Sequence, residues 1–185
     1  METQLTYQQD PKKHRRLSDR QLLYLLIIFT VTFGLVSLLD RFSDGEIPGV
    51  VHLAPASPLS GNILPPAIGA TGDVWQNCGI YRQPVANENA LHTLAHGAIW
   101  VTYQPELEAA AVHSLENLLR GEKYVLLSPY PDQTSPIVVT AWGVQLELSS
   151  VTDTRLMQFI ARYRLSAHAP ESGASCVGGI GEPVR

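Results

Sequence analysis

Residues Leu22 to Leu39 form an uninterrupted run without a charged side chain. A helix of that length spans most of the apolar core of a bilayer, which is about 30 Å thick. A cluster of Lys and Arg residues precedes the run, and acidic residues follow it from Asp40 to Glu46. By the positive-inside rule, this distribution predicts a transmembrane helix over residues 21–39, with residues 1–20 in the cytoplasm.

A cleaved signal peptide is the alternative interpretation, because it also combines a basic start with an apolar middle. The apolar run is longer than the core of an ordinary signal peptide, and Asp40-Arg41-Phe42 is not a small-residue cleavage site. We therefore expect an uncleaved single-pass anchor in the cytoplasmic (inner) membrane. The C-terminal part of the chain would then be extracytoplasmic.

The composition changes after the apolar run, which divides the rest of the chain in two. Residues 40–72 are rich in Pro, Gly, Ser and Ala, and five prolines there disfavour regular helix. We expect this stretch to be a tether. Residues 73–185 then form the folded extracytoplasmic domain.

The charge balance argues against a nucleic-acid partner. The chain has a formal net charge of −4, and five of its 13 Lys and Arg residues lie within the first twenty positions. The remainder is therefore clearly acidic. Binding to phosphate backbones needs clustered Lys and Arg, so we expect no nucleic acid partner for the outer domain.

Residues 88–103 combine a short helix with a buried strand. His92 and His96 are one helical turn apart, so their side chains share a face. Gly97 is the residue type that most readily ends a helix, because glycine adopts the left-handed conformation at no steric cost. The following run, Ile99 to Tyr103, is β-branched and aromatic, which favours a strand.

The remaining pattern predicts an α+β fold. Pro105 begins a second helix and Asp153 caps a third, while residues 124–128, 137–142 and 144–148 have the composition of strands. This order predicts a small two-layer domain, with helices packed on a mostly antiparallel sheet. A ferredoxin-like arrangement is the nearest simple topology. The Gly- and Pro-rich tail from Ala167 onward should be irregular.

The paired histidines are the best candidates for metal ligation. Imidazoles at positions i and i+4 of one helix can chelate one ion, and imidazole suits copper or zinc. A stable site needs a third ligand, and the sequence offers four candidates: His52, Glu88, His113 and Met157. The alternative is that both rings are structural, packing under the strand and bonding backbone carbonyls at the helix end.

The sequence contains no complete catalytic set. The histidine pair has Thr93 and Ala95 where a metalloprotease motif would place its general base. Ser128 and Ser135 flank a proline-rich loop without the turn that exposes a serine nucleophile. We therefore expect no enzymatic activity.

The two cysteines, Cys78 and Cys176, would lie in an oxidising compartment. A disulfide is the favoured outcome, and a soft-metal dithiolate or two buried thiols are the alternatives. Tyr130 lies between Pro129 and Pro131 in a loop, which makes it a candidate contact residue for a partner.

Several blocks of residues, taken in order, resemble a bacterial family known as domain of unknown function 3105. The resemblance extends from about Pro65 to Cys176. The blocks that carry it are Asn77-Cys-Gly-Ile-Tyr81, Glu88-Asn-Ala-Leu-His92 with His96-Gly97, Ser128-Pro-Tyr-Pro131, Ala141-Trp-Gly143 with Gln145-Leu146, and Pro170-Glu-Ser-Gly-Ala-Ser-Cys176. The resemblance implies an anchored extracytoplasmic layout and no particular activity.

The chain departs from the family pattern at two positions. Members of that family usually carry a histidine where this chain has Thr71, and a glutamate where it has Ala95. If those positions help to bind something polar, this chain has lost part of the set.

Two functional hypotheses follow from the sequence. The first is a membrane-anchored accessory or interaction module without catalysis, such as a small subunit that docks on partner membrane proteins. The second is an extracytoplasmic metal-binding protein that handles copper through His92 and His96.

Overall fold

The computed structural model describes residues 18–43, 45–53 and 64–184, and among residues 19–43 it describes the side chains of 20–32. The chain divides into two units, Met1–Gly45 and Glu46–Arg185. Most of the expected cytoplasmic segment, and residues 44 and 54–63 of the expected tether, lie outside the described residues.

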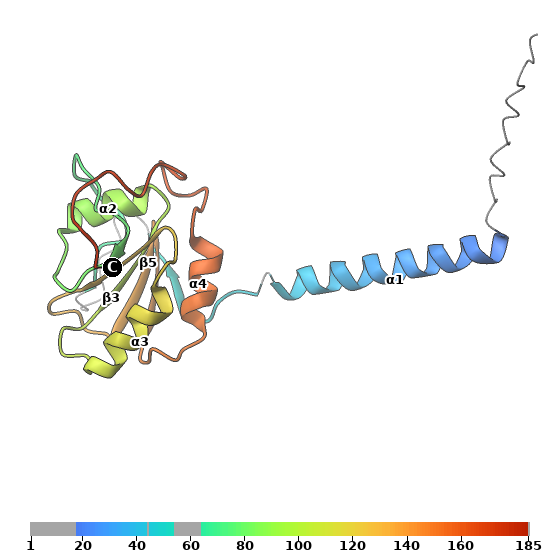
Figure 1. Cartoon of the computed structure of the whole chain (residues 1–185), viewed down its shortest axis with the longest axis horizontal. Coiled ribbons are helices and arrows are strands. Elements are labelled where there is room, and N and C mark those ends of the chain that lie inside the picture. Colours follow the sequence, from blue (N-terminus) through green and yellow to red (C-terminus); the bar gives the residue numbers. More distant parts are fainter. Residues whose placement is uncertain (1–17, 44, 54–63, 185) are drawn as a thin grey trace, which may run out of the picture. The chain divides into compact units, whose positions relative to one another are not determined.

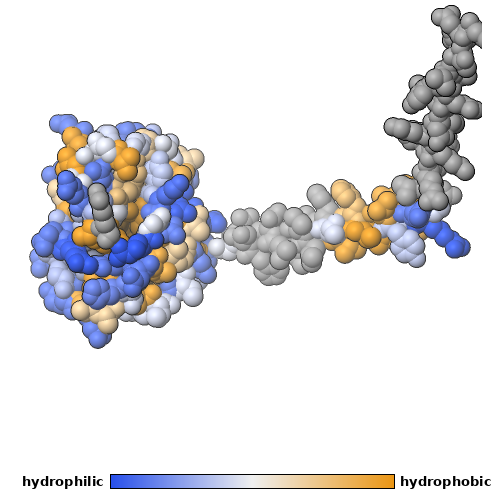
Figure 2. Space-filling view, in the orientation of Figure 1, coloured by the Kyte–Doolittle hydropathy of each residue, from blue (hydrophilic) through white to orange (hydrophobic). Residues whose placement is uncertain are grey.

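The first unit contains helix α1, Asp19–Ser43 (Figure 1). Its described apolar side chains, from Leu22 to Val31, are exposed, and Figure 2 shows them as a hydrophobic surface. In the described part of the chain, no helix meets the length and apolarity needed to cross a membrane. The expected transmembrane segment continues beyond residue 32, where the side chains lie outside that part.

The second unit is built on one six-stranded sheet with the strand order β1-β6-β5-β3-β4-β2. The neighbouring pairs β1–β6, β6–β5 and β5–β3 are antiparallel. The pairs β3–β4 and β4–β2 are parallel. The strands are β1 Val50–His52, β2 Gly79–Ile80, β3 Ile99–Tyr103, β4 Val125–Pro129, β5 Ile137–Ala141 and β6 Val144–Leu148. The helices are α2 Asn87–Ala95, α3 Ala109–Leu119 and α4 Arg155–Tyr163.

The central strand β3 is buried along its whole length, because both faces of the sheet are covered. Its alternate residues Ile99, Val101 and Tyr103 join a core with α3 and α4. Trp100 points to the other face and packs with Leu94 of α2. The domain therefore has three layers, and Figure 1 shows α2 separated from α3 and α4.

This arrangement confirms the mixed α+β class, but the expected number of two layers is wrong. We expected helices on one face only, but the aromatic Trp100 needs an apolar cover on the second face, and α2 supplies it. The ferredoxin-like topology is also wrong. In that fold the two strands joined by a crossover helix are separated by another strand, whereas here β3 and β4, joined through α3, are direct parallel neighbours.

The expected tether contains part of the folded unit. Val50 to His52 form an edge strand on β6, and Ile47 is buried in the core beside it. Ala67 is also buried, and its carbonyl accepts a hydrogen bond from Gly143. The domain therefore begins near residue 46 and not at residue 73. A three-residue strand among prolines and glycines gives too short a pattern to be recognised in the sequence.

The described part of the C-terminal tail has no helix or long strand, as expected. It nevertheless pairs with one segment of the folded domain. Bridges join Gln76 to Ile180 and Ile80 to Val184. The backbone N–H of Asn77 donates to the Ile180 carbonyl at 2.9 Å. The tail thus lies beside residues 75–81.

Candidate metal centre

Helix α2 ends where the sequence predicts, and this ending places both histidines. His96 caps the helix and its backbone N–H donates to the His92 carbonyl, while the N–H of Gly97 donates to the Leu94 carbonyl. Gly97 has φ +90°, the left-handed conformation expected of a terminating glycine. A Cβ at this position would lie only 3.0 Å from Cα of Leu165. The glycine is therefore required both by conformation and by the close approach of the chain.

The two imidazole rings pack against each other, and each directs its Nδ1 atom toward a backbone carbonyl. Their centroids are 4.8 Å apart at an interplanar angle of 80°. Nδ1 of His92 lies 2.7 Å from the Gly72 carbonyl oxygen, and Nδ1 of His96 lies 2.7 Å from the Ser175 carbonyl oxygen. A carbonyl can only accept, so each Nδ1 carries a proton and donates it. In a neutral imidazole this leaves the lone pair on Nε2.

Both Nε2 atoms face one carboxylate, that of Glu171. Oε2 of Glu171 lies 3.4 Å from Nε2 of His96 and 3.8 Å from Nε2 of His92. Among the described residues, these three side chains form the group of His, Cys, Asp or Glu able to hold one metal ion, with ligand atoms within 4.8 Å of one another. The histidine side chains are 13% and 3% exposed, whereas that of Glu171 is 53% exposed.

Backbone hydrogen bonds hold Glu171 at the end of α2. Its N–H donates to the Ala95 carbonyl at 2.9 Å, and the N–H of Gly173 donates to the His96 carbonyl at 3.1 Å. The tail therefore satisfies carbonyls that a helix C-terminus would otherwise leave unpaired. The same bonds bring the carboxylate to the histidines. A cation placed here would also lie near the partial negative charge of the helix end.

Trp75 forms one wall of this group. Its ring centroid lies 5.0 Å from that of His96 and 5.8 Å from that of His92. A Cβ at Gly179 would clash with the Trp75 carbonyl and would lie 2.8 Å from the indole nitrogen. Trp75 therefore packs closely against both the imidazoles and the tail.

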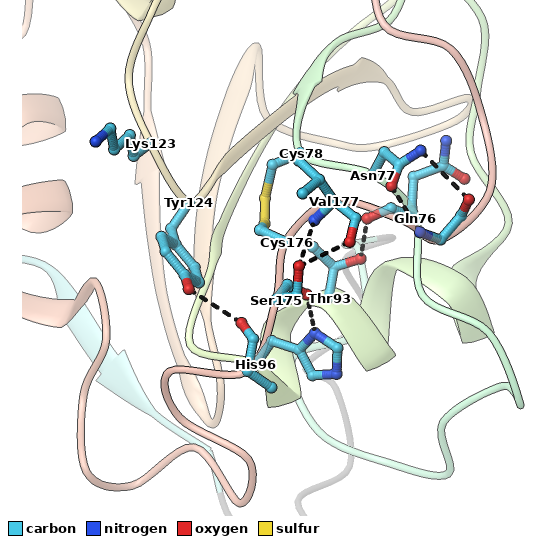
Figure 3. The surroundings of a disulfide bond; sticks show 12 residues. Gln76, Asn77, Cys78, Thr93, His96, Lys123, Tyr124, Ser175, Cys176 and Val177 are labelled. Atoms are coloured by element: carbon cyan, nitrogen blue, oxygen red, sulfur yellow. Dashed lines mark hydrogen bonds between the residues drawn. A yellow bond between two sulfur atoms is a disulfide. The ribbon is translucent and has the colours of Figure 1, made fainter.

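The disulfide prediction is confirmed, because Cys78 and Cys176 are bonded with their Cα atoms 5.4 Å apart. Figure 3 shows this bond beside the Ser175 carbonyl and the His96 ring. The backbone N–H of Cys78 also donates to the Cys176 carbonyl at 2.8 Å. The disulfide therefore lies one residue from the carbonyl that orients His96.

None of the four third ligands suggested by the sequence joins the pair. His52 lies on β1 with its ring 6.3 Å from that of Tyr163, and Met157 packs against the core on α4. Glu88 lies one turn before His92 on α2 but is not part of the group. The third position belongs to Glu171, which sequence reasoning missed because its segment has no periodic pattern.

His113, the remaining suggestion, belongs to a separate ionic cluster on α3. Its Nδ1 lies 3.6 Å from Oε2 of Glu116, and Arg82 forms two hydrogen bonds with the same carboxylate at 2.9 and 3.1 Å. The Arg82 guanidinium holds the pKa of Glu116 below its usual value, although burial opposes this shift. Burial and, to a smaller extent, the negative charge of Glu116 raise the pKa of Tyr103.

Tyr130 is half-buried and lines a pocket of about 420 Å³ with Val85, Asn87, Pro131 and Asp132. Its ring packs edge-on against Trp100, with centroids 5.7 Å apart. Its hydroxyl accepts a hydrogen bond from the Asn87 amide at 3.3 Å. The residue thus packs onto the domain and still faces an open pocket, so its role as a contact residue stays a prediction.

The two departures from the family pattern fall next to the site. Thr71 directly precedes Gly72, whose carbonyl accepts the His92 hydrogen bond. Ala95 is 1% exposed, and its carbonyl accepts the backbone hydrogen bond of Glu171.

Two of the three separations between the candidate ligand atoms are close to those in a zinc site, and all three are within 4.8 Å. Ligand atoms about 2.0–2.2 Å from a tetrahedral zinc ion lie roughly 3.3–3.6 Å from one another. The two nitrogen-to-oxygen distances of 3.4 and 3.8 Å are close to this range. Three protein ligands would leave a coordination position for water or another ligand.

One protein family matches most of this chain. Residues 52–178 match the family described as "Protein of unknown function (DUF3105)", and the matched range contains both histidines, Glu171 and the disulfide. Neither the curated proteins nor the solved structures contain a match. Because the match covers well over half of the chain, the protein belongs to the DUF3105 family.

Proposed function

We propose that the domain binds a divalent transition-metal ion through His92, His96 and Glu171. The observation that carries this proposal is the orientation of the two rings. Each Nδ1–H donates to a backbone carbonyl, and each Nε2 faces the shared carboxylate. Metal-binding histidines almost always have such an outer partner, which fixes the tautomer and turns the lone pair toward the metal.

The donor set favours Cu²⁺ or Zn²⁺. Two imidazoles and a carboxylate are borderline to hard ligands, whereas Cu⁺ prefers thiolate and thioether sulfur. Met157 packs in the core with α4, and the two cysteines are joined to each other. The proposed function is therefore the binding of Zn²⁺ or of copper as Cu²⁺, and not of copper as Cu⁺.

Titration of the purified full-length protein with Cu²⁺ and with Zn²⁺ tests this proposal. We expect the wild type to bind one ion per chain, and His92→Ala/His96→Ala to abolish binding. Glu171→Gln should weaken binding, because the neutral amide is a poorer ligand than the carboxylate. His52→Ala and His113→Ala are matched controls that remove imidazoles outside the group. Equal, weak binding by the wild type and the double histidine variant would refute the proposal.

We place this domain on the outer side of the cytoplasmic membrane, held by residues 21–39. The support is the sequence pattern, a charge-free apolar run after a basic segment. Protease added to intact spheroplasts should digest the C-terminal domain and spare the first twenty residues. The reverse pattern would contradict this orientation.

An accessory role in a membrane complex is the second candidate. Exposed apolar side chains on and near the tail favour it, with Val177 68% exposed and Ile180 and Val74 also exposed. Such side chains can contribute to a protein interface. Blue-native electrophoresis of gently solubilised membranes should show a complex larger than the 20.3 kDa chain. Migration as a free monomer alone would exclude this role.

A further inference from the structure

The candidate metal centre is completed by two irregular segments that flank helix α2. Segment 72–78 supplies the Gly72 carbonyl that orients His92 and the Trp75 ring that packs on both imidazoles. Segment 171–176 supplies the Glu171 carboxylate and the Ser175 carbonyl that orients His96. Helix α2 and its C-cap contribute the two histidines, and these segments contribute the two carbonyls, the carboxylate and the indole that contact them.

The disulfide between Cys78 and Cys176 joins the two segments covalently. It lies at the last residue of each segment and immediately follows Ser175 (Figure 3). Cys78 is partly exposed, whereas Cys176 is 7% exposed. The link therefore lies close to the metal-facing groups, with one of its two residues partly at the surface.

Other contacts between these parts of the chain are hydrogen bonds that open more easily than a covalent bond. Asn77 exchanges side-chain bonds with the backbone of Gly179 and Gly181 at 2.8 to 3.4 Å. Glu171 itself is held by backbone hydrogen bonds with Ala95 and Ala174, and just over half of its side chain is exposed. Without the disulfide, the carboxylate and the Ser175 carbonyl would lose their strongest constraint.

We propose that the Cys78–Cys176 disulfide controls the affinity of the metal centre, so that reduction of this bond weakens metal binding. The proposal rests on the proposed metal-binding function. In the reducing step a dithiol transfers two electrons and two protons to the sulfurs. The S–S bond breaks, Cys78 and Cys176 become thiols, and the dithiol closes to its own disulfide. The metal centre would then bind its ion tightly in the oxidised protein and weakly in the reduced protein.

The expected effect is a loss of about ten- to a hundredfold in affinity. Removing the outer partner of a metal-binding histidine typically has an effect of this size. Release of the tail would disorder one such partner, Ser175, together with the ligand Glu171. The partner of His92, the Gly72 carbonyl, lies on the opposite segment and would be affected less.

The first experiment compares Zn²⁺ affinity in the oxidised full-length wild type and in Cys78→Ser/Cys176→Ser, by competition with a chromogenic chelator. The serine variant removes the link without creating thiolates that would themselves bind zinc. Near-UV circular dichroism checks that it remains folded. Affinity at least tenfold weaker in the folded variant supports the proposal. Equal affinity refutes the proposal and leaves the metal function intact. If the oxidised wild type does not bind, the proposed function fails and this inference fails with it.

A second experiment keeps both cysteines and does not depend on the folding of the serine variant. The disulfide of the wild type is equilibrated in glutathione buffers of different potential, with and without Zn²⁺. Because coupling between two sites is reciprocal, zinc should make the disulfide harder to reduce. A tenfold affinity difference corresponds to a shift of about 30 mV in reduction potential. The His92→Ala/His96→Ala variant keeps both cysteines, so it measures any shift that zinc causes by binding the reduced thiols. With zinc, the disulfide of the wild type should be harder to reduce than that of this variant, and equal shifts in the two proteins would overturn the proposal.

Discussion

The Nδ1 atom of His96 lies 2.7 Å from the carbonyl oxygen of Ser175, a residue 79 positions further along the chain. His92 has the same relationship with Gly72, 20 positions earlier. These two bonds turn the other nitrogen of each ring toward Glu171. A pair of merely structural histidines would also bond carbonyls, but it would not need to share a carboxylate on its remaining nitrogens.

The affinity of the centre for Zn²⁺ should fall as the pH decreases below neutrality. Protons and the metal compete for the same Nε2 lone pairs, so binding releases protons. Isothermal titration calorimetry at several pH values measures this loss. Far-UV circular dichroism at each pH serves as the control for folding. A pH-independent affinity in the folded protein would indicate that imidazole is not the ligand.

Trp75 should report metal binding through its fluorescence. Its ring lies within 5.0 and 5.8 Å of the two imidazole centroids. Paramagnetic Cu²⁺ bound by these rings should therefore quench Trp75 strongly. Trp75→Phe should remove most of the quenching, whereas Trp142→Phe, the matched control, should retain it. Quenching that survives Trp75→Phe would place the copper elsewhere.

Gly97→Ala should lower the free energy of unfolding by at least about 2 kcal/mol. The left-handed φ of +90° costs an alanine about 1 kcal/mol, and the added Cβ would meet Cα of Leu165 at 3.0 Å.

Gly121→Ala is the matched control for this substitution. Gly121 has φ +83°, but no atom lies within 4 Å of an added Cβ. We therefore expect only the conformational cost there, about 1 kcal/mol. Urea denaturation of both variants measures the difference. Equal losses would mean that the Leu165 backbone adjusts freely to the new side chain.

Glu116→Gln should destabilise the protein at neutral pH and have little effect in acid. Arg82 lowers the pKa of Glu116 from the ordinary value of 4.5. A carboxylate whose pKa is lower in the folded state stabilises the fold above its unfolded pKa. This contribution is lost as the pH falls below 4.5 through the folded pKa.

We expect the loss for Glu116→Gln to be about 1 kcal/mol at pH 7, because the carboxylate is buried but its Arg82 partner is 58% exposed. Glu106→Gln, an exposed residue before the same helix, should have no effect at either pH. Thermal unfolding at pH 7 and near pH 3.5 measures both variants. A difference that persists unchanged in acid would rule out the ion pair as its source.

Local features of the fold could be predicted because they depend on short sequence patterns. The helix ending at Gly97 and the strand from Ile99 to Tyr103 follow from glycine at a helix end and a β-branched, aromatic run. The strand from Val144 to Leu148 was likewise predicted at its observed bounds. The order of the strands in the sheet could not be predicted. No local sequence pattern shows whether β3 and β4 are direct neighbours or are separated by another strand.

The candidate site was predicted in part for the same reason. The i and i+4 spacing of His92 and His96 is a local property, and it places the rings together. Glu171 approaches them through a backbone bond to Ala95, and such long-range pairing leaves no periodic signal. The cysteines gave one long-range clue. A link between Cys78 and Cys176 brings the segment containing Glu171 close to the segment before α2, so the cysteine pair indicates which distant carboxylate lies near the histidines.

The convergence of ligands from distant parts of the chain has a thermodynamic consequence. An unfolded chain keeps the two histidines near each other but not Glu171, so the metal should bind the folded state preferentially. Free metal at a hundredfold excess over its dissociation constant would then stabilise the domain by about 2.7 kcal/mol. The melting temperature of the domain would accordingly rise with the free metal concentration, and a thermal melt would serve as a direct gauge of how much of the protein is loaded.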